Sequence, residues 1–324
     1  MINNYDIKEK REHLENAVMM ITGKDNLSVN DLKPILEELE EYVLKVMERD
    51  IHYINISTRK QVASYIIECV NKGWEKGYFT SGNITDALLR IIHTCKSFID
   101  IRHGDFGNCL YDYHLGFNFG NSFANRNMRH IIFHEVVHAF SNFFLSTVGF
   151  YKENSQKDKT YMKITSNSHN FIPIINYKFK SFLSEVIAEA TACDLANTYS
   201  PSKIQVAPGI YSDWIVIYNR EYQQLGYEFL RTISNDVNKD ERQLFKELTI
   251  RIINGDNIGA EILKVYETKN PDTWKDDLHE ITTVLGEIVT THNWNIEKVN
   301  RVRELMKKYT PSIKVVSRND TPSI

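Results

Sequence analysis

The HEVVH segment at residues 134–138 contains the side chains best suited to metal chemistry in this chain. Residues four apart lie on one face of a helix, so the imidazoles of His134 and His138 can reach one Zn²⁺ at about 2.0–2.1 Å. Glu135 lies at the edge of that face. Zinc lowers the pKa of a water to about 7, and the Glu135 carboxylate can accept its proton as the water attacks a carbonyl carbon. The spacing therefore predicts a zinc site with Glu135 as general base.

A third ligand is needed, because catalytic zinc usually has three protein ligands. The metzincin pattern does not supply it, since Ser141 and Phe144 stand where that pattern has glycine and histidine. The segment LSEVIAEATACDLA instead places Glu185 and Glu189 four residues apart in an apolar stretch. Two carboxylates on one stripe of a buried helix need a cationic partner, and zinc with its histidines would provide one.

The HEVVH helix followed by this acidic helix resembles the gluzincin branch of the HExxH zinc metallopeptidases, over residues 110–195. The resemblance implies a zincin-like core, Zn²⁺ as cofactor and hydrolysis of a peptide or protein substrate. Transferred by position, it implies that Glu185 is the third ligand and that Glu189 orients a ligating histidine. A shifted register, with Glu189 on zinc and Asp194 beside it, stays open.

The run RHIIFHEVVHAF is more loosely similar to metalloprotease effectors that bacterial pathogens inject into host cells. The first residues are charged and contain no Sec-type apolar run, so we expect a cytoplasmic-type protein without a Sec signal peptide. The resemblance implies delivery into a host cell by a specialised secretion system. The four cysteines lie far apart, which favours reduced thiols.

A peptidase of this type also needs a donor that stabilises the oxyanion, usually a Tyr or His after the third ligand. Tyr211 and His279 are the candidates that we favour. His130 extends the histidine stripe by one turn, but it lies about 12 Å along the helix axis from His138. All three histidines therefore cannot bind one ion, and we expect His130 to contact solvent or a carboxylate.

The composition is that of an ordinary globular protein, with 42% apolar and 25% charged residues and a net charge of -3. This charge provides no basic surface for nucleic acid. Charged residues interrupt every apolar stretch, so no membrane span is expected.

Two elements are expected to position the metal ligands: apolar helices at 128–145 and about 180–197. Alternating aromatic residues at 109–121 predict a half-buried strand. The resemblance implies that this strand is an edge strand along which a substrate peptide adds, although an interior strand fits the pattern equally well. The polar segment 151–170 predicts a long loop.

The remaining sequence is expected to be helical. Apolar residues at three- and four-residue steps predict helices before residue 100, with Ser28 or Asn30 as a cap of the second. The helices expected there and after Trp214 cover about 32–47, 58–74, 84–98, 214–234, 240–253, 257–267, 274–291 and 295–308.

These elements predict an α+β fold that is mostly α. A zincin-like core with a small sheet and an active-site helix, at 101–200, is flanked by an N-terminal helical segment at 1–100 and a C-terminal helical subdomain at 201–311. Residues 312–324 are expected to form a flexible tail.

Two alternatives remain. In the first, the chain is a helical protein-interaction module whose HExxH motif is inactive or incidental. In the second, zinc only stabilises the fold, because a fourth protein ligand closes its coordination shell.

Overall fold

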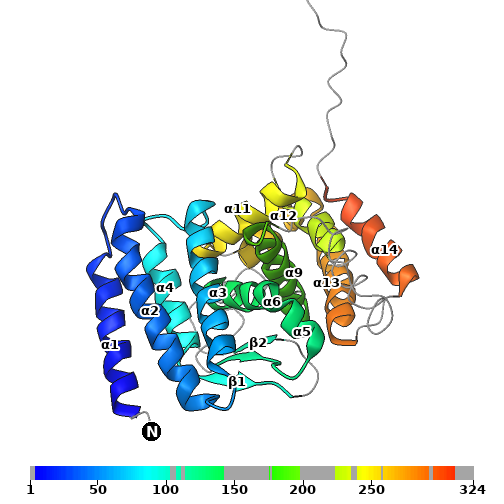
Figure 1. The fold of residues 1–324 in the computed structure, drawn as a ribbon. Coiled ribbons are helices and arrows are strands. Elements are labelled where there is room, and N and C mark those ends of the chain that lie inside the picture. The colour runs from blue at the N-terminus through cyan, green and yellow to red at the C-terminus, as the bar shows by residue number, and fades with distance from the viewer. Residues whose placement is uncertain are drawn as a thin grey trace, which may run out of the picture.

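The computed structural model is mostly α with one small sheet, which confirms the expected fold class (Figure 1). The residues that it describes are 4–102, 107–110, 114–141, 175, 177–197, 223–234, 239–256, 258–291 and 295–310. The predicted loop at 151–170 and the tail from 312 lie outside the described residues. Within the described ranges, no helix is both long enough and apolar enough to cross a membrane.

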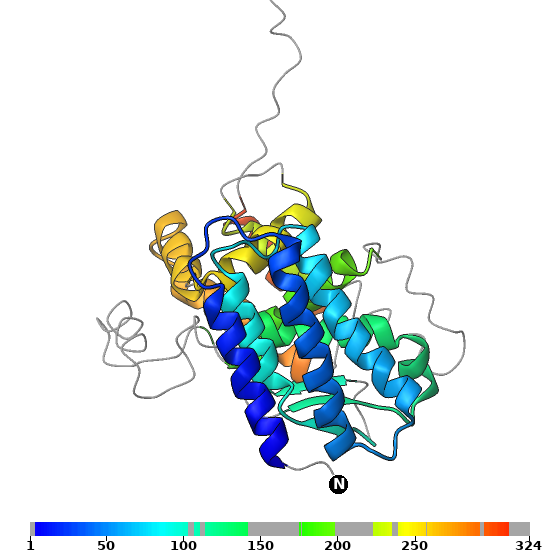
Figure 2. The same cartoon turned by 60° about the vertical axis from the view of Figure 1, so that its left-hand side comes forward.

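Four helices precede the sheet: α1 (Asn4–Met20), α2 (Val29–Asp50), α3 (Ile56–Glu75) and α4 (Ile84–Thr94). They stand side by side in both views (Figures 1 and 2). Ser28 caps α2: its hydroxyl accepts from the backbone N–H of Asp31, and its own N–H donates to the Asp31 carboxylate at 2.9 Å. Of the two predicted caps, Ser28 is therefore the one used.

The predicted helix at 84–98 is too long, because α4 ends at Thr94. The cause is a contact with a distant part of the chain. The carboxylate of Asp50 accepts hydrogen bonds from the backbone N–H of Phe98 at 2.9 Å and from the hydroxyl of Ser97 at 3.1 Å. These bonds hold Phe98 in a strand, so local periodicity alone overestimates the helix.

The sheet contains β1 (Phe98–Asp100), β2 (Gly107–Leu110) and β3 (His114–Phe117), in the order β1-β3-β2. β1 is parallel to β3, and β2 is antiparallel to it, with Leu110 opposite His114. The single strand predicted at 109–121 is therefore wrong. The chain reverses between β2 and β3, and alternation cannot distinguish one long strand from two paired strands. Among the described strands, β2 is an edge and β3 is interior.

Helices α5 (Ser122–Arg126) and α6 (Met128–Ser141) follow the sheet, and α6 packs against β2, α3 and α4. Helix α9 (Tyr177–Leu195) packs against α6. The two helices predicted around the metal ligands are thus confirmed over the described residues. Most of the surface of helix α6 is buried, as expected for a helix that is apolar on all sides.

The C-terminal helices are α11 (Glu241–Ile253), α12 (Ile258–Lys269), α13 (Trp274–Thr291) and α14 (Ile296–Lys307), and residues 223–231 are also helical. Their bounds confirm the predicted helices to within a few residues where the structure describes them. Helix α13 packs along α9, on the side of the molecule opposite α1 (Figure 1).

Helix α9 connects two hydrophobic clusters. Ala188, Ala192 and Leu195 belong to the cluster formed by the N-terminal helices, the sheet and α6. Phe182 and Val186 belong to the cluster formed with the C-terminal helices. Because its side chains are packed into both clusters, α9 has little freedom to shift, so carboxylates on it are held at defined positions relative to α6. The domain boundaries at 100, 200 and 311 stay a prediction.

Candidate metal centre

The packing of α6 on α9 brings three predicted ligands together. The Nε2 atoms of His134 and His138 lie 3.0 Å apart. The Glu185 carboxylate lies 3.2 Å from His134 Nε2 and 3.4 Å from His138 Nε2. Neighbouring ligand atoms in a tetrahedral zinc shell stand about 3.3 Å apart, given bonds of about 2.0–2.1 Å. The two imidazoles and the carboxylate, whose two oxygens each face one imidazole, therefore have about the spacing of neighbouring ligands in such a shell.

The contacts of the two Nδ1 atoms favour the same arrangement, in which the Nε2 atoms of His134 and His138 face Glu185. His134 Nδ1 lies 2.9 Å from a Glu189 oxygen, and His138 Nδ1 lies 3.2 Å from the Ser184 hydroxyl. A carboxylate only accepts, so in a metal-bound centre His134 would keep its Nδ1 proton, directed to Glu189, and give up its Nε2 proton so that this nitrogen presents a lone pair to the ion. The donor set, two imidazoles and a carboxylate, suits zinc. The described residues contribute three ligand atoms to this group, which leaves a fourth position for water or substrate.

The charges of the centre favour a cation. Burial by itself would lower the pKa of His134, but the hydrogen bonds that its ring donates to Glu185 and Glu189 hold that pKa well above its usual value. Burial would likewise raise the pKa of Glu185, yet His138 and His134 hold it below its usual value. Both carboxylates are thus ionised and face the imidazoles, and a divalent ion would balance their charge.

Glu135 is buried on the same helix, against the edge strand. A Cβ atom placed on Gly107 of β2 would lie 2.6 Å from Glu135 Oε1 and 2.7 Å from Ile131 Cγ2. Real Cβ atoms do not approach so closely, so only glycine lets β2 pass this carboxylate without a shift. Gly107 is a residue of the site that the sequence pattern did not indicate.

Cys109, two residues further along β2, also lies near the centre. Burial, and then the negative charge of Glu135, raise the pKa of the Cys109 thiol well above its usual value. The Cys109 thiol is therefore protonated at neutral pH and is a poor nucleophile. This agrees with the expectation of reduced thiols at this position.

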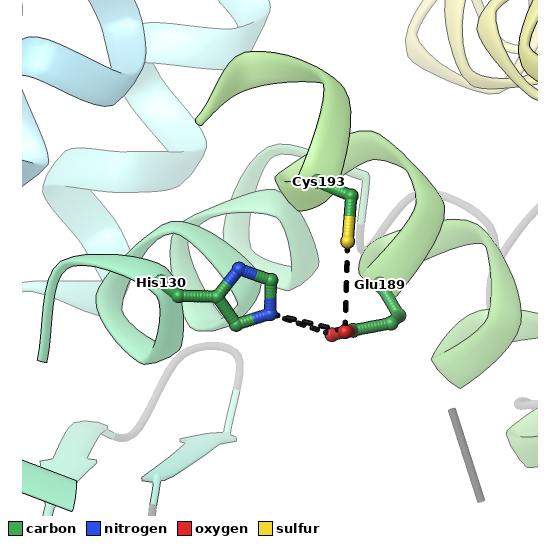
Figure 3. A group of neighbouring side chains, drawn as sticks. All are labelled: His130, Glu189 and Cys193. Atoms are coloured by element: carbon green, nitrogen blue, oxygen red, sulfur yellow. Dashed lines mark hydrogen bonds and ion pairs between the residues drawn. The ribbon is translucent and has the colours of Figure 1, made fainter. Parts of the chain in front are cut away.

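A second group of side chains adjoins the first (Figure 3). His130 reaches from α6 to Glu189 on α9, with its Nε2 3.0 and 3.1 Å from the two carboxylate oxygens. The predicted contact of His130 with a carboxylate is thereby confirmed. Cys193 lies one turn beyond Glu189 on α9 and directs its sulfur to Glu189 Oε1 at 3.7 Å. Cys193 is buried, as the apolar helix predicts.

Asp194, the residue considered for a shifted register, is directed elsewhere. Its buried carboxylate accepts from the Tyr78 hydroxyl at 3.0 Å and from the Arg242 guanidinium at 2.5 Å, and Lys76 Nζ lies 3.4 Å away. These partners come from the end of α3 and from α11. Asp194 therefore joins α9 to both hydrophobic clusters, and its position suits a structural role.

The two candidates for oxyanion stabilisation are not brought to the centre by the described residues. Tyr211 lies outside them. His279 is described, and it is exposed on α13. Ser184, which contacts His138, could have been anticipated from the sequence because it directly precedes Glu185 on the same helix.

Comparisons with protein-family models, with curated proteins and with solved structures found no match to this chain. Its chemistry is therefore inferred from its own residues.

Proposed function

We propose that the protein is a zinc-dependent peptidase. One observation carries this proposal: the Nε2 atoms of His134 and His138 lie 3.0 Å apart, and the Glu185 carboxylate lies 3.2 Å from the first and 3.4 Å from the second. These three residues would hold the ion, and Glu189, which accepts a hydrogen bond from His134 Nδ1, would orient the His134 ring. The looser resemblance to injected effectors would place the substrate in a host cell.

The roles of the residues follow from their positions. Bound zinc would supply Lewis acidity that polarises a substrate carbonyl and acidifies a water. The Glu135 carboxylate accepts a proton from the attacking water and delivers it to the leaving amine nitrogen. Its burial beside β2 keeps it dry and limits its motion, both of which favour proton transfer.

The edge strand β2 suits an extended substrate. Among the described strands, β2 pairs with β3 on one side only, and Gly107 brings its backbone against Glu135. A peptide that adds alongside β2 would form backbone hydrogen bonds whatever its side chains are. Such a peptide would lie next to the carboxylate that moves the proton.

The direct test is to incubate the zinc-loaded protein with a proteome-derived peptide library and to identify new termini by mass spectrometry. We expect cleavage that a zinc chelator abolishes and that added Zn²⁺ restores. Failure of the zinc-loaded protein to cut any peptide would contradict the peptidase proposal and would favour the interaction module.

The variant Gly107→Ala is expected to lower the rate of cleavage about a hundredfold, the cost of misplacing a reacting group by about 1 Å. The new methyl group must displace the Glu135 carboxylate or push β2 away from it. Zinc content should stay at the wild-type level, because no ligand is changed. The rate is measured on a peptide from the library, and zinc by elemental analysis.

Gly120→Ala is the matched control, since a Cβ there would meet nothing closer than 3.8 Å and the backbone is not in the left-handed region. It should retain wild-type activity. Equal rates in Gly107→Ala and Gly120→Ala would show that β2 does not constrain Glu135.

A further inference from the structure

The three side chains of Figure 3 differ from the predicted zinc ligands in one chemical respect: they include a thiol. His130 Nε2, a Glu189 oxygen and Cys193 Sγ all lie within 4.8 Å of one another. They come from two helices that are fixed by packing, and the side chains of His130 and Glu189 are 24% and 10% exposed. An ion could therefore enter past His130, while the other two side chains are held in the interior.

The distances fit a metal shell. In tetrahedral coordination, an imidazole nitrogen and a carboxylate oxygen stand about 3.3 Å apart, and a thiolate sulfur and a carboxylate oxygen about 3.6 Å apart. The corresponding distances here are 3.0 Å, from His130 to Glu189, and 3.7 Å, from Cys193 to Glu189. An ion between His130 and Glu189 would need these two atoms to separate by about 0.3 Å.

We propose that His130, Glu189 and Cys193 form a second metal site, for a divalent transition-metal ion with affinity for sulfur, such as Zn²⁺ or Co²⁺. Binding releases the thiol proton of Cys193 and requires the proton of His130 to reside on Nδ1, so that Nε2 provides a lone pair. The set of thiolate, imidazole and carboxylate suits zinc, and the remaining position is left for water. Metal binding at this site does not depend on peptidase activity.

The geometry also couples the two sites, a consequence that rests on the proposed zinc centre. Glu189 Oε1 faces Cys193, Oε2 accepts from His134 Nδ1 at 2.9 Å, and His130 Nε2 lies close to both oxygens. An ion at the second site withdraws charge from the carboxylate and weakens its bond to His134. Loss of such a supporting partner lowers metal affinity about 10–100-fold. Filling the second site should thus weaken zinc binding at the first about tenfold.

The test is a spectroscopic titration of reduced, metal-free protein with Co²⁺. The first centre contains no sulfur, so a thiolate-to-cobalt charge-transfer band in the near ultraviolet reports the second site alone. We expect this band in wild type and in Glu185→Ala, a smaller band in His130→Ala, and none in Cys193→Ala. Cys95→Ala, which removes another buried thiol, is the matched control and should keep the band.

Absence of the band in wild type, or its persistence in Cys193→Ala, would overturn the second site. In that case the three side chains would serve only to orient His134.

The coupling between the two sites is tested by competition with a chelator. The zinc affinity of the first centre should fall about tenfold when the second equivalent of metal binds, in wild type but not in Cys193→Ala. An unchanged affinity would overturn the coupling. Because Glu185→Ala keeps the band if this proposal holds, failure of the zinc-peptidase proposal is distinguished from failure of the second site.

Discussion

In a Cys193→Ala background, which removes the proposed second site, Glu185→Ala is expected to purify without zinc, whereas the protein with Glu185 intact binds about one equivalent at the first centre. The carboxylate closes the ligand face with both imidazoles, at 3.2 and 3.4 Å, so its removal leaves two ligands and an open cavity. The loss of affinity should exceed the roughly hundredfold that removal of an outer partner costs. Zinc is measured by elemental analysis after purification without added metal or chelator, and its affinity by competition with a chromogenic chelator.

Two substitutions on the same helix serve as comparisons. Glu189→Ala should lower zinc affinity about 10–100-fold, because Glu189 orients His134. Asp194→Asn should leave it unchanged, because Asp194 contacts Tyr78 and Arg242. Cys193→Ala is combined with each variant, so that metal at the second site is not counted. If zinc is retained in Glu185→Ala and lost in Glu189→Ala, the shifted register is correct.

Glu135→Gln is expected to lower kcat about 10²–10⁴-fold, the usual contribution of a general base. The amide has almost the same shape as the carboxylate but cannot accept the proton of the attacking water. Zinc content should not change, since Glu135 is not among the three ligand atoms of the group. The measurement is the steady-state cleavage rate of a peptide identified from the library, together with elemental analysis.

Glu135→Asp is a milder variant. It keeps the carboxylate charge but moves it toward the helix by about one methylene group, so we expect a cleavage rate between those of wild type and Glu135→Gln. Wild-type activity in Glu135→Gln would rule out this residue as the base. Glu135→Gln also distinguishes a peptidase from a protein-interaction module. In a module, Glu135→Gln would retain binding of a partner, and no cleavage would be seen even in wild type.

Local regularities could be predicted from the sequence. His134 and His138 share a face because four residues nearly complete one helical turn, and this holds wherever the helix packs. The C-terminal helices were equally predictable, because their apolar periodicity reports the same local geometry. The predicted secondary structure was wrong where contacts with distant residues outweighed the preference of the local sequence. Asp50 ends the helix before Phe98, and pairing divides the alternating segment into β2 and β3.

The choice among acidic residues of α9 needed the tertiary structure. Glu185, Glu189 and Asp194 are all compatible with an acidic apolar helix, and sequence spacing alone left the register open. Packing of α6 against α9 directs Glu185 to the two Nε2 atoms and Glu189 to His134 Nδ1. Asp194 lies on another side of α9 and meets Tyr78 and Arg242 instead.

The types of ligand were thus determined by the sequence, since a helix fixes the spacing of residues a few positions apart. Which carboxylate faces the two imidazoles, why position 107 needs glycine, and why His130 meets Glu189 were decided only by tertiary structure. Contacts between α6, α9 and β2 join residues far apart in the chain. Their geometry depends on how two hydrophobic clusters pack around α9, which no local pattern encodes.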